Sequence, residues 1–183
     1  YAEINYETLW DDEVFNNTLK QYDWLHLHHE DFTGQYGKFY RNYHNAPWYI
    51  EQKTQFENLA KKYGMPSVHE EKKAVTRAIK NYISNGGFLF AMCSATDSYD
   101  IALSLENIDG VHSVFDGTPI DNDIQNKIDY SKSLVFKDFK IYTDPMIYEF
   151  SDIDYPPSHN PVTRGAEADY FSLFEFSAKY DPV

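Results

Sequence analysis

Residues 86–100, GGFLFAMCSATDSYD, constrain the fold more than any other stretch of the chain. Two glycines precede a short apolar run, and small polar residues that can open a helix follow it. An apolar run of this kind is typical of a strand in a parallel sheet that is covered on both faces. The pattern therefore predicts a strand over 88–92 that turns sharply into a helix at Cys93, the single cysteine of the chain.

Strands and helices are expected to alternate along the rest of the chain. In residues 22–30, YDWLHLHHE, the two leucines face one way, and the tryptophan and the first two histidines face the other. Further strands are predicted over 1–9, 133–143, 146–153 and 170–180, and helices over 11–21, 47–63, 67–84 and 96–106. This alternation indicates a single α/β domain over residues 1–183, built on an open, mostly parallel sheet.

Two of the predicted helices carry start signals. Pro47 suits the first turn of a helix, and Asn45 is its expected N-cap. In S-V-H-E, residues 67–70, Ser67 and Glu70 have the spacing of a capping box. These signals fix where both helices begin.

Composition and charge exclude several classes of function. The net charge of −13 argues against nucleic acid or an anionic membrane surface as a partner. One cysteine excludes an internal disulfide framework and a zinc finger. No apolar run approaches the roughly 20 residues of a transmembrane helix. Because the sequence opens at Tyr1 inside a predicted strand, we expect it to be a segment of a longer chain.

The expected turn at Cys93 has the form of a nucleophile elbow. Such an elbow needs small residues two positions to either side of the nucleophile, and here these are Ala91 and Ala95. The amino end of the following helix, with the Ser94 amide, would stabilise a thiolate and an oxyanion. Asp97 and Asp100, in the opening turns, would oppose that effect.

A cysteine nucleophile needs a base, and three histidines are candidates. His28 and His29 end a strand that is expected to neighbour the cysteine strand, and His159 lies in a later loop. The segment EDFTG would form the second wall of an oxyanion and substrate pocket through residues Glu30, Asp31, Thr33 and Gly34. The predicted catalytic set is therefore Cys93 with His28, His29 or His159 as base.

Two alternatives to this set stay open at the level of the sequence. Cysteine is among the most buried residue types, so Cys93 can equally be an inert core thiol. His26 and His28 share one strand face and could bind an ion together with further ligands from His29, Glu30, Asp31 and Cys93. An H-x-H pair is short and common, so we expect neither a metal nor another cofactor.

The order of these parts resembles the class I glutamine amidotransferase-like superfamily. YDWLHLH resembles the strand that leads into that family's oxyanion loop, and GGFLFAMCSATDSYD falls where its Gly-x-Cys-x-Gly turn would lie. The resemblance implies a flavodoxin-like sheet with helices on both faces, which lacks its first strand and helix in this segment. It also implies a hydrolase or amidotransferase-like activity carried by Cys93.

Two narrower resemblances add expectations about cellular context. In the ThuA-like (trehalose-utilisation) branch, GG and an apolar strand lead into a small-residue turn and TD, and His typically stands at the position of Cys93. Residues 23–52, DWLHLHHEDFTGQYGKFYRNYHNAPWYIEQ, resemble bacterial envelope proteins often labelled asparagine synthetase B. These resemblances imply a periplasmic or outer-envelope location and a small-molecule, glycan or envelope-protein partner. The alternative function is a non-catalytic binding or assembly module of an envelope complex.

Overall fold

The computed structural model describes residues 5–153 of the chain. Within them the protein is a mixed α/β structure whose two strands, β1 (Trp24–His28) and β2 (Phe88–Met92), form a small parallel sheet. Trp24 pairs with Phe88 and His28 with Met92, so the carboxyl ends of both strands meet at one edge. The predicted pairing of the histidine strand with the cysteine strand is confirmed.

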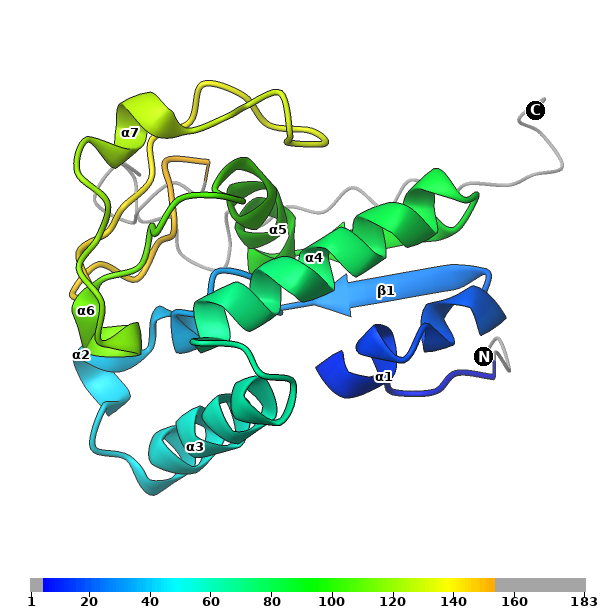
Figure 1. Cartoon of the computed structure of the whole chain (residues 1–183), viewed down its shortest axis with the longest axis horizontal. Coiled ribbons are helices and arrows are strands. Elements are labelled where there is room, and N and C mark those ends of the chain that lie inside the picture. Colours follow the sequence, from blue (N-terminus) through cyan, green and yellow to red (C-terminus); the bar gives the residue numbers. More distant parts are fainter. Residues whose placement is uncertain (1–4, 154–183) are drawn as a thin grey trace, which may run out of the picture.

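The helices are α1 (Asp11–Phe15), α2 (Tyr40–Tyr43), α3 (Pro47–Lys62), α4 (Val68–Ser84), α5 (Ser94–Ser104), α6 (Ser113–Asp116) and α7 (Ile124–Lys127), with 3-10 turns at Thr18–Gln21 and Tyr36–Lys38. In Figure 1 the long helix α4 lies across the sheet, and α5, which follows β2, packs beside it. The predicted helices at 47–63, 67–84 and 96–106 are confirmed, whereas that at 11–21 is divided because Asn17 takes a left-handed φ of 62°.

The two faces of the sheet have different environments. One face packs its leucines and Ala91 into a core with α4 and α5, whose centre includes Val75, Ile79 and Ala95. On the other face Phe88 and Phe90 are 58% and 44% exposed. The expectation that both faces of β2 are covered is therefore wrong for the part of the chain that the structure describes. The apolar run was insufficient to decide it, because burial of one face requires only every second residue.

One of the two predicted caps is correct. Ser67 Oγ accepts a hydrogen bond from the Glu70 amide at 3.2 Å and caps α4. The N-cap of α3 is Ala46, which makes no side-chain capping bond, so the prediction of Asn45 is wrong. The Asn45 amide lies 2.9 Å from His44 Nε2 instead.

Several predicted strands are absent from residues 5–153. Residues 5–10 form no strand, and 133–143 and 146–153 share only one antiparallel bridge, between Ile141 and Ser151. Their apolar residues pack irregularly against α5, where Phe139 and Phe150 join a core with Ile101 and others. The alternation of apolar and polar residues in these segments therefore reflects packing against α5 rather than pairing in a β-sheet. The predicted strand at 170–180 lies outside the described residues.

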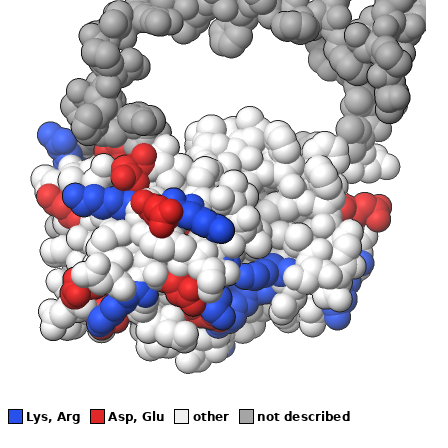
Figure 2. Space-filling view, turned by 90° about the horizontal axis from the view of Figure 1, so that it is seen from above, with Lys and Arg blue, Asp and Glu red and all other residues white. Residues whose placement is uncertain are grey.

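The surface carries charges of both signs. Figure 2 shows acidic and basic side chains next to one another on the face it displays, with no continuous basic patch there. No helix within residues 5–153 is long and apolar enough to cross a membrane. The absence of a transmembrane segment expected from the sequence is thus consistent with the described helices.

Candidate functional site

The backbone bends abruptly at Cys93, between β2 and α5. Cys93 is the N-cap of α5 with φ 53° and ψ −138°, a combination that side-chain-bearing residues rarely adopt. Ala95 is completely buried beneath this turn, so a larger residue there would collide with the core. The strand-to-helix elbow predicted from the sequence is present, and its strain is concentrated at the single thiol.

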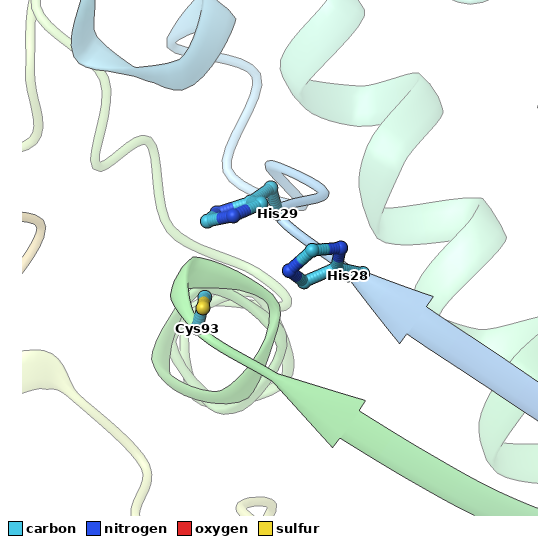
Figure 3. A group of neighbouring side chains, drawn as sticks. All are labelled: His28, His29 and Cys93. Carbon is cyan, nitrogen blue, oxygen red and sulfur yellow. The ribbon is translucent and has the colours of Figure 1, made fainter.

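The thiol is exposed and lies beside two imidazoles. Cys93 Sγ and one ring nitrogen each of His28 and His29 all lie within 4.8 Å of one another. Figure 3 shows both rings above the turn that opens α5, with His28 at the end of β1 and His29 in the following loop. Exposure of the thiol is inconsistent with an inert core cysteine.

Different backbone features position the two histidines beside Cys93. His28 is the last residue of β1 and pairs with Met92, the residue before the cysteine. His29 has a positive φ of 66°, which turns the chain back so that its ring approaches that of His28 at 4.1 Å between centroids. The ends of two parallel strands and one left-handed residue therefore assemble the group.

A buried serine ties the histidine loop to the cysteine helix. Ser98, in the second turn of α5, is completely buried. Its hydroxyl donates to the Glu30 carbonyl at 2.9 Å and accepts from the Phe32 amide at 3.4 Å. The loop that carries His29 is thus bonded to the helix that begins beside Cys93, although no sequence signal singled out Ser98.

Asp97 and Asp100 lie in the opening turns of α5, as expected, and both carboxylates accept backbone hydrogen bonds. The Asp100 carboxylate accepts three backbone hydrogen bonds, of 2.7 to 2.9 Å, from the amides of residues 134–136. Asp97 is buried, and its Oδ1 accepts from the Ser98 amide at 2.8 Å. Asp100 therefore organises the segment after α7, and its charge is engaged by donors outside the first turn of the helix.

The predicted oxyanion loop is organised around Asp31. Its carboxylate accepts from the Thr33 amide at 2.7 Å, from the Thr33 hydroxyl at 2.6 Å and from the Gly37 amide at 2.9 Å. Gly34 has a φ of +83°, and a Cβ there would lie 2.7 Å from the His69 backbone. Thr33 and Gly34 are buried against α4. The Thr33 amide is therefore engaged by Asp31, whereas Ser94 opens α5, where N–H groups lack an intrahelical partner.

A cleft of about 350 Å³ borders the histidines. His28, His29, Glu30 and Asp31 line it together with aromatic rings and Lys72. Cys93 is not among the lining residues, and the two histidines connect the cleft to the thiol because their ring nitrogens lie within 4.8 Å of Sγ. A ligand in the cleft would meet both rings, an aromatic wall and side chains of both charges.

A buried lysine closes the loop that forms this wall. Lys38 donates to the Tyr142 carbonyl at 2.7 Å. Burial lowers the pKa of Lys38 to about 8, although the nearby Asp31 carboxylate opposes that shift. Tyr36 and Lys38 both have positive φ, so this turn is a second place where backbone strain gathers near the histidines.

The structure brings together three of the four predicted catalytic residues. His159 lies outside the described residues, so its role stays a prediction. The chain matches no family model, no curated protein and no solved structure. The assignment of function therefore depends on the geometry of this site.

Proposed function

We propose that the chain is a cysteine-dependent hydrolase or amidotransferase-like protein on a flavodoxin-like sheet, with Cys93 as nucleophile. The observation that carries the proposal is the strained elbow at Cys93 with two imidazoles within 4.8 Å. Strained φ/ψ values at a strand-to-helix turn are characteristic of nucleophile elbows. Within this limit the sulfur and a ring nitrogen can be joined by rotation of the exposed side chains or through one water.

The proposed reaction follows from the positions of these groups. The thiol proton passes to His28 or His29, and the sulfur attacks a carbonyl carbon. Amides at the start of α5, including that of Ser94, face the place where the oxyanion develops. The imidazolium then protonates the leaving amine or alcohol, and water hydrolyses the resulting thioester to regenerate the thiol. The cleft holds the remainder of the substrate, for which its aromatic wall favours a small molecule or a glycan.

Alkylation of Cys93 tests this proposal, because the chain contains no other thiol. We expect iodoacetamide to label native Cys93 faster than N-acetylcysteine near neutral pH. His28→Gln and His29→Gln should slow labelling, whereas His44→Gln, an exposed histidine outside the site, should not. Labelling no faster than that of the free thiol, and insensitive to both site histidines, would exclude the nucleophile.

The exposed sheet face favours a second candidate, a binding or assembly module of the cell envelope. Trp24 lies 5.7 Å from Phe88 and 6.4 Å from Phe90 in edge-to-face contacts, and all three rings are exposed. Exposed apolar patches of this kind mark interaction surfaces. On this candidate, Cys93→Ser in the native gene leaves the biological role intact, while Phe90→Ser removes it. A Cys93→Ser defect with unchanged folding would exclude the module.

A further inference from the structure

We propose that His28, His29 and Cys93 bind a divalent transition-metal ion of the zinc type. Two imidazole nitrogens and a thiolate sulfur form a donor set that Zn²⁺ uses in proteins. Of the described histidines, cysteine and acids, these three form the one group of three or more whose ligand atoms all lie within 4.8 Å of one another. The sequence allowed such a site but gave no reason to prefer it, because His29 and Cys93 meet only through the sheet.

The geometry requires only small movements. With bonds of about 2.0–2.3 Å, the ligand atoms of a tetrahedral zinc ion lie about 3.5 Å apart. In the structure the three ligand atoms lie within 4.8 Å of one another. All three side chains are exposed, so rotation can bring these atoms closer together. The backbone that carries them is held by the β1–β2 pairing and by Ser98. Three ligands on fixed backbone leave the fourth position open to water.

Metal binding and nucleophilic catalysis would exclude each other at this site. On binding, the thiol releases its proton to solvent, and the Sγ–metal bond replaces one bond between the ion and water. The sulfur lone pair and the two candidate bases beside it, His28 and His29, are then engaged by the ion. This regulatory consequence depends on the proposed function, whereas the binding itself does not.

Cobalt is a suitable probe because Co²⁺ occupies zinc-type sites and is coloured. We expect the 183-residue chain to give a thiolate-to-cobalt charge-transfer band on titration, and added Zn²⁺ to abolish it. Cys93→Ser should lose the band, and His28→Gln and His29→Gln should each weaken binding at least about tenfold. His26→Gln is the matched control, since His26 lies on the same strand face, with its ring 6.3 Å from that of His28, outside the group.

The outcomes separate the two proposals. Absence of the band at saturating cobalt, or an equal loss of affinity in His26→Gln, would overturn the metal site. Thermal unfolding of each variant distinguishes a lost ligand from a lost fold. Zn²⁺ should protect Cys93 from iodoacetamide, and a chelator should restore labelling. Tight cobalt binding with slow alkylation of the metal-free protein would support the metal site and reject the nucleophile; rapid alkylation without cobalt binding would do the reverse.

Discussion

The exposed site residues His28, His29 and Cys93 differ sharply from the buried polar residues Glu71, Ser98 and Asp100 beneath the surface. The first three are open to solvent, and two of them have strained backbone. The other three are almost completely buried, and Ser98 and Asp100 bond to backbone groups of distant segments. The comparison teaches that the reactive groups gather at the carboxyl end of β1 and at the start of α5, whereas stability is expected to depend on buried polar groups within α4 and α5. Substitutions can test that separation.

The largest effect is expected for Asp100→Ala. Its carboxylate accepts three backbone hydrogen bonds, and hydrogen bonds to a buried charged group are each worth about 1.5–3 kcal/mol. We expect the free energy of unfolding in urea to fall by about 3–5 kcal/mol. Glu51→Ala removes an exposed carboxyl from α3 and should change it by less than about 0.5 kcal/mol. Equal effects of the two substitutions would contradict the role of Asp100.

A second effect concerns the pH dependence of stability. Burial, reinforced by the Asp11 carboxylate, raises the pKa of Glu71 to about 8 from 4.5. Between these values the folded protein holds a proton that the unfolded chain has lost, so stability is greatest below the lower value and falls as pH rises. From about pH 6 to 8 we expect the wild type to lose about 2 kcal/mol relative to Glu71→Gln.

Unfolding in urea across this pH range measures the difference. Glu51→Gln, on an exposed position of α3, is the control and should follow the wild type at every pH. Parallel curves for the wild type and Glu71→Gln would show that the buried carboxyl does not titrate in this range.

Ser98→Ala links the two sets of residues. Losing its hydroxyl leaves the Glu30 carbonyl and the Phe32 amide without this partner, which should lower stability by about 1–2 kcal/mol. Because the loop carries His29, alkylation of Cys93 should also slow. Ser104→Ala is a matched control, as the hydroxyl of this buried serine donates to the Ile101 carbonyl within the same helix. If Ser104→Ala slowed alkylation equally, Ser98 would have no positioning role.

The smallest expected change is an increase in stability, for Cys93→Gly. Glycine adopts the φ and ψ of Cys93 without strain, so Cys93→Gly should raise the free energy of unfolding by about 1 kcal/mol and abolish labelling. Ala95→Gly, two residues later inside the helix, should lower it by about 1 kcal/mol. A destabilised Cys93→Gly would mean that the cysteine side chain itself contributes to folding.

The sequence predicted those features that local patterns encode. Helical periodicity and the Ser67 cap located α4, and the apolar run between Gly87 and Cys93 located β2. The meeting of His28 and Cys93 followed from strand pairing, because parallel strands end at one edge. Where alternation stood alone, as in residues 133–143, it was misread as a strand.

Contacts between distant segments were beyond this kind of prediction. From the sequence, Asp100 is recognisable only as an acidic residue in a predicted helix. Its hydrogen bonds to the amides of residues 134–136 depend on the folded structure. The two hydrogen bonds of Ser98 are likewise formed with a loop more than sixty residues earlier. The left-handed backbone at His29 could not be predicted either, because glycine, the residue that usually marks such a conformation, is not at this position.

The Asp100 carboxylate also bears on local opening of the structure and on amide hydrogen exchange. The amide protons of Leu134, Val135 and Phe136 are sequestered by it, although they belong to neither helix nor strand. Their exchange with deuterium requires that α5 and this irregular segment separate. We therefore expect slow exchange at these three irregular residues, which would report the separation of the segment from α5.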